Sequence, residues 1–184
     1  LGYNAFVADI YGKGIRPTSM EACASEAGKY RDDRPLLRAR ARAALEQLKK
    51  LPGTDAGKTA AIGYCFGGMT VLELARDGAA VNGVVSFHGA LNTPNAADAA
   101  RIKGRVLALH GADDPLVPPA EVAAFEDEMR KARVDWQFVA YGNAVHSFTN
   151  FSLPEDQPGP VSYNKKADER SWIAMQDFFK ELFH

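Results

Sequence analysis

Apolar residues occur along the chain in two patterns: short continuous runs, and longer stretches with helical spacing. Continuous runs of this length predict strands that are buried on both faces, and recurrence every three to four residues predicts helices. We expect strands over residues 1–10, 59–64, 81–87, 105–109 and 136–141. We expect helices over residues 36–50, 69–75, 119–133 and 164–183, and a helical stretch that begins at Ser19 and is interrupted near residues 32–35.

The alternation of strands and helices predicts the fold class. Strands that alternate with helices form a mostly parallel sheet with helices on both faces, which is an α/β architecture. The 184 residues suit a single domain covering residues 1–184. One long irregular segment, residues 150–165 with a proline-rich part over 153–160, interrupts the pattern, and long loops in compact domains often serve binding.

Composition and charge exclude several classes of protein. Hydrophobic residues make up 46% of the chain and charged residues 24%, and the net charge is −1. No long run of one charge sign predicts a nucleic acid or an anionic membrane surface as a partner. No stretch has the roughly 18 consecutive apolar residues that a membrane-spanning helix needs. Two isolated cysteines do not form a disulfide framework and fit a reducing compartment, so we expect a cytoplasmic location, with Cys23 serving only in packing.

The sharpest chemical signal is Gly63-Tyr64-Cys65-Phe66-Gly67-Gly68, between a predicted strand and a predicted helix. It matches the Gly-x-Ser-x-Gly nucleophile elbow, with cysteine in place of serine. Glycines two residues before and after the nucleophile would remove side chains that collide across the tight turn. The helix N-terminus would favour a thiolate on Cys65, and the N–H of Phe66 would stabilise an oxyanion. The alternative is a glycine-bounded turn with an inert, buried cysteine.

Two further loops supply a candidate acid and a candidate base. The segment 110–118 follows a predicted strand and carries two acids, of which we favour Asp114, with Asp113 as a turn-forming residue. This segment also has a plainer interpretation as a polar turn, and we expect His110 to be structural. His146 follows the last predicted strand, where a general base is expected. The order of nucleophile, acid and histidine favours a catalytic triad over a surface histidine.

Other residues are weaker candidates for the site. His88 ends a predicted strand and is expected to line the pocket, together with Tyr64, Phe148 and Asn150. The arginines between residues 31 and 42 most simply form a solvated helix face, although one of them could bind an acidic substrate. The sequence contains no metal-ligand spacing and no glycine-rich phosphate loop, so no metal is expected.

These motifs resemble the dienelactone hydrolase family (carboxymethylenebutenolidase-like), a branch of the α/β-hydrolases. The resemblance rests on Gly-Tyr-Cys-Phe-Gly-Gly at 63–68, the segment 114–118, and Val-His-Ser-Phe at 145–148, and it extends over essentially the whole chain. It implies an α/β-hydrolase fold and a cofactor-free Cys-His-Asp triad that opens lactones or cleaves esters. It also implies a small-molecule substrate, and we expect a monomer or a homodimer.

The sequence departs from that family pattern in two places. Family members carry strands ahead of the point where this chain begins, and these supply a second oxyanion donor and a glutamate that contacts the thiol. The chain is therefore expected to be an N-terminally incomplete hydrolase, either as a partial record or after cleavage. The dienelactone-specific enzymes also place an arginine four residues after the histidine, where this chain has Asn150. That change favours a broader esterase over an enzyme for an anionic dienelactone.

The expected function is hydrolysis of an ester or lactone through an acyl-thioenzyme on Cys65, with phosphotriester hydrolysis as a side activity. A non-catalytic binding protein with the same fold is the alternative from another class. A serine esterase that acts through Ser86 or Ser147 is a further alternative, although neither serine lies in an elbow.

Overall fold

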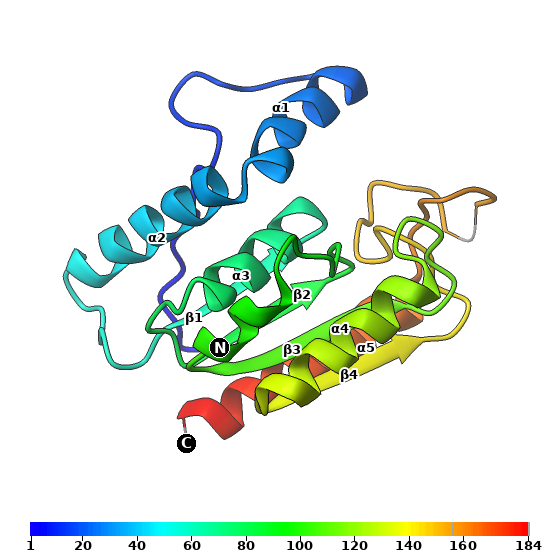
Figure 1. Ribbon diagram of the computed structural model, residues 1–184. Helices are drawn as coiled ribbons and strands as arrows, with labels where there is room; N and C mark the ends of the chain where they lie inside the picture. The colour runs from blue at the N-terminus through cyan, green and yellow to red at the C-terminus, as the bar shows by residue number, and fades with distance from the viewer. Residues whose placement is uncertain (156, 184) are drawn as a thin grey trace. The chain divides into compact units, whose positions relative to one another are not determined.

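The computed structural model describes residues 1–155 and 157–183, which form two compact units (Figure 1). The N-terminal unit spans Leu1–Gly57 and the C-terminal unit spans Lys58–His184. The N-terminal unit contains the helices α1 (Met20–Asp32) and α2 (Arg34–Lys50). The C-terminal unit contains, in chain order, β1 (Ala60–Tyr64), α3 (Phe66–Arg76), β2 (Gly83–Phe87), the 3₁₀ helix η1 (Ala96–Arg101), β3 (Arg105–Gly111), α4 (Pro119–Ala132), β4 (Trp136–Tyr141) and α5 (Lys165–Phe183).

The structure of the first ten residues differs from the prediction. We expected a buried strand there, but the segment forms no strand and is largely exposed, including Leu1 and Val7. The sheet in the described part of the chain pairs β1 to β4 only with one another. An extended segment forms the hydrogen bonds of a sheet only when it lies beside a neighbouring strand. An apolar run alone is therefore not enough to make a strand.

The N-terminal unit is a pair of helices joined at Asp33. The hydroxyl of Ser19 caps α1 by accepting the N–H of Ala22, and the carboxylate of Asp33 caps α2 by accepting the N–H of Leu36. The predicted interruption near residues 32–35 is confirmed, because Asp33 ends one helix and begins the next. Capping of this kind stabilises a helix by about 1 kcal/mol.

The C-terminal unit is built on a four-stranded parallel sheet in the order β1-β2-β3-β4. All four strands therefore end at the same edge of the sheet, where the loops that carry the candidate site residues begin. Figure 1 shows α4 and α5 on opposite sides of β3 and β4. In open parallel sheets the carboxyl edge is where ligands bind.

Helices cover both faces of this sheet, as predicted. A Cβ placed on Gly83 would meet Phe178 and Leu182 of α5, and a Cβ placed on Gly68 of α3 would meet Ser86. Because successive residues of a strand point to opposite faces, the face with Gly83 lies against α5 and the face with Ser86 lies against α3. The core beneath α5 comprises Val85, Phe87, Leu107, Leu109, Tyr141, Ala144, Phe148, Ala167, Met175, Phe178 and Phe179.

The predicted elements of this unit are present with shifted ends. Helix α3 begins at Phe66 rather than Met69, directly after Cys65, and β3 continues through His110 to Gly111. The short helix η1 was not predicted, since six residues rich in alanine carry no helical periodicity. Among the described helices, none is long and apolar enough to cross a membrane.

Candidate active site

Cys65 lies in a tight turn between β1 and α3. Its backbone is at φ 54° and ψ −114°, a conformation that L-residues rarely adopt. Strain of this kind costs about 1–3 kcal/mol and persists only where the surroundings fix the backbone. Here the N–H of Cys65 donates to the carbonyl of Phe87 (3.0 Å), and its carbonyl accepts from the N–H of Met69 (3.2 Å). These bonds anchor the turn to β2 and to the first turn of α3, and the thiol remains exposed.

Glycines make this turn possible, although not the pair that we predicted. A Cβ on Gly63 would overlap the backbone carbonyl of Gly67, so the first glycine is required as expected. A Cβ on Gly67 itself would meet no atom within 4 Å, and the prediction of a collision there is wrong. The second crowded position is Gly68, where a Cβ would come within 2.9 Å of the Cα of Gly89. Gly68 and Gly89 thus let α3 approach the loop that follows β2.

A chain of two hydrogen bonds joins the three residues predicted as a triad. The Nδ1 of His146 lies 2.8 Å from the Oδ2 of Asp114, and its Nε2 lies 3.1 Å from the Sγ of Cys65. Asp114 follows β3 and His146 follows β4, so the parallel strands deliver all three residues to one edge. The competing acid Asp113 is exposed and is not bonded to the histidine.

Backbone contacts hold the acid loop against the histidine loop. The N–H of Asp113 donates to the carbonyl of Ala144 (3.0 Å), and a Cβ on Gly111 would lie 2.6 Å from that same carbonyl oxygen. The second oxygen of Asp114 accepts the N–H of Leu116 (2.8 Å). The carboxylate therefore has a fixed orientation before it meets the imidazole. Gly111 was not singled out from the sequence, because a glycine after a strand is typical of many turns.

The environment of His146 favours its charged form. Burial lowers the pKa of His146, but the hydrogen bonds to Asp114 and Cys65 and the charges of these two groups outweigh burial and raise the pKa to about 9. At neutral pH an imidazolium can donate through Nδ1 to the carboxylate and through Nε2 to the sulfur. Such a pair supplies both a nucleophile and a proton donor.

Phe66 is the first residue of α3, beside the thiol. The N–H groups in the first turn of a helix are not used by the helix's own backbone bonds, and they favour negative charge. This location agrees with the predicted oxyanion role of Phe66, which stays a prediction.

A cavity of about 530 Å³ opens beside the thiol. Of the four residues predicted to line it, Tyr64, His88 and Asn150 do so, and the prediction for Phe148 is wrong. Phe148 is fully buried in the core, where its ring packs edge-on against His88 at 5.1 Å. The lining among the described residues is Tyr64, Cys65, His88, Ser147, Thr149, Asn150, Phe151 and Asp168.

Four lining residues were not predicted to lie there, and one of them, Ser147, had been considered only as an alternative nucleophile. Thr149 and Phe151 flank Asn150 in the loop after His146, and their proximity to the histidine was the signal available. Asp168 lies in the first turn of α5, and no local pattern connects it with the loops that carry the triad.

Two further histidines in the described part of this unit, His88 and His110, are buried and uncharged. Burial, together with the charge of His146, lowers the pKa of His88 to about 3, and its Nε2 lies 2.8 Å from the hydroxyl of Thr149. Burial also lowers the pKa of His110, whose ring packs against Phe138. His88 thus adds no positive charge to the cavity, and His110 agrees with its predicted structural role.

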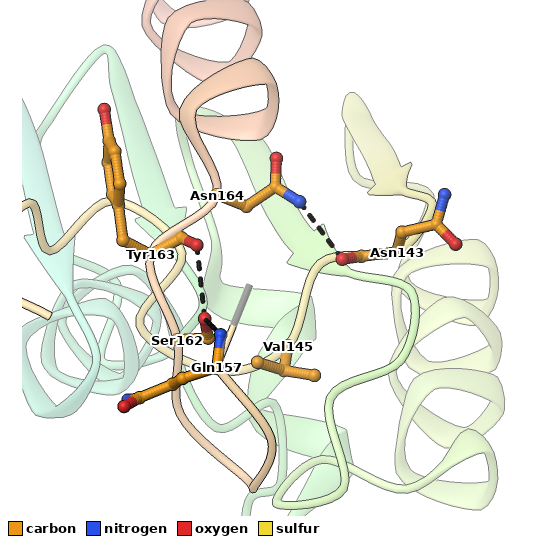
Figure 2. A pocket seen from close by; sticks show the side chains of 6 residues that line it. All are labelled: Asn143, Val145, Gln157, Ser162, Tyr163 and Asn164. Atoms are coloured by element: carbon orange, nitrogen blue, oxygen red, sulfur yellow. Dashed lines mark hydrogen bonds between the residues drawn. The ribbon is translucent and has the colours of Figure 1, made fainter. Parts of the chain in front are cut away.

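A second, smaller cavity of about 210 Å³ is lined in part by Val145, the residue before His146. Figure 2 shows the amide of Asn164 pointing to the carbonyl of Asn143 (3.1 Å) and Gln157 bonded to Ser162. The N–H of Ser162 also donates to the carbonyl of His146 (3.2 Å). The residues around this cavity therefore connect the loop before α5 to His146 and help to hold the histidine in place.

Within residues 1–155 and 157–183, no group of three His, Cys, Asp or Glu side chains is arranged to hold a metal.

The parallel sheet, the helices on both of its faces and the elbow after β1 define a protein of the α/β-hydrolase fold. The sequence model of the dienelactone hydrolase family matches residues 1–183, and the chain belongs to this family of hydrolases.

Individual relatives agree with this assignment. The chain is 45% identical to a solved structure described as a dienelactone hydrolase-like promiscuous phosphotriesterase from metagenomic libraries, with a TM-score of 0.90 over 97% of this chain and 74% of that one. An uncharacterised protein of Caenorhabditis elegans is 37% identical over 80% of this chain and 94% of its own. A relative from Methylorubrum extorquens, whose name refers to carboxymethylenebutenolidase, is 27% identical over 98% of this chain, which spans 63% of that protein's length.

Proposed function

We propose that the protein hydrolyses carboxylic esters or lactones with Cys65 as the nucleophile, His146 as the general acid and base, and Asp114 as the residue that orients the imidazole. The observation that carries this proposal is the continuous hydrogen-bonded chain from carboxylate to imidazole to sulfur, 2.8 and 3.1 Å long. Membership of a hydrolase family supports it further.

In the first half of the reaction, the sulfur of Cys65 attacks the ester carbonyl carbon and forms a C–S bond. The carbonyl oxygen becomes an oxyanion that the N–H of Phe66 stabilises. When the intermediate collapses, the C–O bond to the alcohol breaks, and the Nε2 proton of His146 passes to the departing oxygen. Asp114 maintains the Nδ1–H tautomer and stabilises the imidazolium. The products of this half are an alcohol and an acyl-thioester on Cys65.

In the second half, His146 as a neutral base takes a proton from a water molecule. The hydroxide attacks the thioester carbonyl, the C–S bond breaks, and the carboxylic acid leaves. The sulfur and the imidazolium are then restored to their starting state. No redox step occurs, and no group beyond water and the ester takes part.

The direct test replaces Cys65 by alanine and measures hydrolysis of p-nitrophenyl acetate. We expect kcat/KM to fall by roughly a thousandfold or more, because removal of one member of a triad leaves only binding and oxyanion stabilisation. Cys23→Ala is the matched control, since it removes the other thiol of the chain. Turnover by Cys65→Ala at the normal rate would exclude the assignment.

A second activity, phosphotriester hydrolysis, is favoured by the solved relative described as a promiscuous phosphotriesterase. The same thiolate can attack an activated phosphorus centre and displace an aryloxide. Paraoxon is the suitable probe, and release of p-nitrophenol should depend on Cys65 in the same way as ester hydrolysis. Release that persists in Cys65→Ala would assign this activity to another group.

A binding protein that retains the fold without catalysis is the competing proposal. Iodoacetamide distinguishes the two, because an exposed, histidine-paired thiol reacts faster than an ordinary cysteine. We expect Cys65 to be alkylated well before Cys23. We also propose a reducing compartment such as the cytoplasm, since the nucleophile must remain a free thiol.

A further inference from the structure

The wall of the reaction cavity carries charge of one sign. Of the eight lining residues, Asp168 is the one with an acidic side chain, and the described lining includes no lysine or arginine. Asn150 and Thr149 are neutral, and His88 is uncharged because its pKa is lowered to about 3. A substrate that enters the cavity therefore meets a carboxylate without a compensating cation on the wall.

Asp168 is held by neighbours that do not neutralise it. It lies in the first turn of α5, and its Oδ2 accepts the hydroxyl of Tyr163 at 3.2 Å. Within the described residues no Lys or Arg side chain forms an ion pair with it. Burial raises the pKa of Asp168 and the charge of Glu169 adds to this effect, although the hydrogen bond from Tyr163 lowers it in part. A cation in the cavity would stabilise the charged carboxylate and so counteract this increase in its pKa.

Two aromatic rings complete this part of the wall. Phe151 is 82% exposed; Tyr64 is 41% exposed, and its ring stacks on that of Phe87 with centroids 4.5 Å apart. Burial raises the pKa of Tyr64, and the charge of Asp168 adds to this effect, so the phenol and the carboxylate lie within electrostatic reach of each other. Aromatic faces attract cations, typically by about 0.5–2 kcal/mol.

We propose that this cavity selects esters that carry a cationic group, with Asp168 as the ion-pair partner and the rings of Tyr64 and Phe151 as the apolar and cation–π wall. The inference deepens the proposed function, on which it rests, by naming its substrate class as ammonium-bearing esters. A cavity of about 530 Å³ accommodates an ester with a small ammonium group. Asp168 acts here as a specificity residue, distant in sequence from the residues that react.

The test compares three esters on the wild-type protein and its variants. Acetylcholine carries a trimethylammonium group, 3,3-dimethylbutyl acetate is its neutral isostere, and monomethyl succinate carries an anion. Proton release measured in a pH-stat gives kcat/KM for each. We expect acetylcholine to exceed its neutral isostere about tenfold, which corresponds to a modest ion pair plus a cation–π contact. The anionic ester should be the poorest substrate.

Asp168→Asn should bring the cationic and neutral esters to within about twofold of each other, because it removes the charge while the amide oxygen can still accept from Tyr163. Glu169→Gln is the matched control. It removes the same charge from the next position of α5, whose side chain does not line the cavity, and it should leave the preference intact. Unchanged thermal unfolding of both variants verifies the fold.

Equal kcat/KM for acetylcholine and its neutral isostere in the wild type would overturn the inference. A preference that survives Asp168→Asn, or falls equally in Glu169→Gln, would also overturn it. Failure of the proposed function is distinct from either result, since hydrolysis of the neutral isostere would then be absent or independent of Cys65.

Discussion

The reacting residues and the cavity wall differ in how the molecule holds them. Asp114 and His146 are buried, and each side chain forms two hydrogen bonds. Both residues follow the ends of strands within one sheet. The wall residues Asn150, Phe151 and Asp168 are at least partly exposed and are attached to a loop and to the first turn of a helix. The proposed chemistry thus depends on the sheet. The choice of substrate depends on a loop and a helix end that can change without disturbing the sheet. Substitutions of the reacting residues should therefore change the rate, and substitutions at the wall should change the preference among substrates.

The largest effect is expected from Asp114→Asn. The amide can offer an N–H to Nδ1 of His146, which favours the wrong tautomer, so kcat/KM should fall by roughly a thousandfold in a p-nitrophenyl acetate assay. Asp113→Asn makes the same chemical change one residue earlier in the chain, where the side chain is exposed, and should alter the rate less than about twofold. Comparable losses in the two variants would mean that the buried acid has no special role.

A pair of glycine substitutions tests how the elbow is built. Gly63→Ala places a methyl group on the backbone carbonyl of Gly67, and we expect it to lower the free energy of unfolding by more than about 2 kcal/mol or to prevent folding. Gly67→Ala should be tolerated within about 1 kcal/mol, because its Cβ meets open space. Urea denaturation of both variants measures the difference. Equal destabilisation would contradict the proposed packing of the turn.

The pH dependence of the reaction tests the charge on His146. Its pKa is raised from 6.5 to about 9, so the imidazolium persists from acidic pH up to about 9 and is lost above that value. Alkyl esters need this proton for their leaving group, and their kcat/KM should fall about tenfold per pH unit above 9. p-Nitrophenyl acetate, whose leaving group needs no proton, should show no such decline. A decline that begins near pH 6.5 for alkyl esters would indicate an unperturbed histidine.

The smallest effect is expected at the cavity wall. Asn150→Arg introduces a guanidinium beside the thiol, and the kcat/KM of monomethyl succinate relative to a neutral ester should rise about five- to tenfold. Replacement of Asn150 also removes the hydrogen bond that its Oδ1 accepts from the N–H of Ser152 (3.1 Å). Asn150→Gln is the control for this loss, because it changes the side chain without adding a charge. An unchanged ratio in Asn150→Arg would show that position 150 does not contact the acyl group.

The contrast between the two regions also explains what the sequence could predict. Cys65, Asp114 and His146 each follow a strand with a recognisable apolar run, so their convergence at one edge follows from the parallel sheet. Asp168 has no such relation to a strand, and only the packing of α5 brings it to the cavity.

Other differences have local physical causes. Phe148 was predicted to line the cavity, but it is fully buried and belongs to the core beneath α5. Residues 1–10 resemble a buried strand in composition, yet a strand requires a partner, and none of the described strands pairs with them. The crowded glycine is Gly68 rather than Gly67, because the close approach comes from the Gly89 loop, which no local motif specifies.

The most direct test of the central claim is to trap the acyl group. The protein is mixed with p-nitrophenyl acetate, quenched in acid within the first turnover, and mapped by peptide mass spectrometry. We predict an acetyl group on the peptide that contains Cys65, in an amount that follows the burst of p-nitrophenol. An acetyl group on Ser86 or Ser147, or a full burst with Cys65 unmodified, would contradict the account.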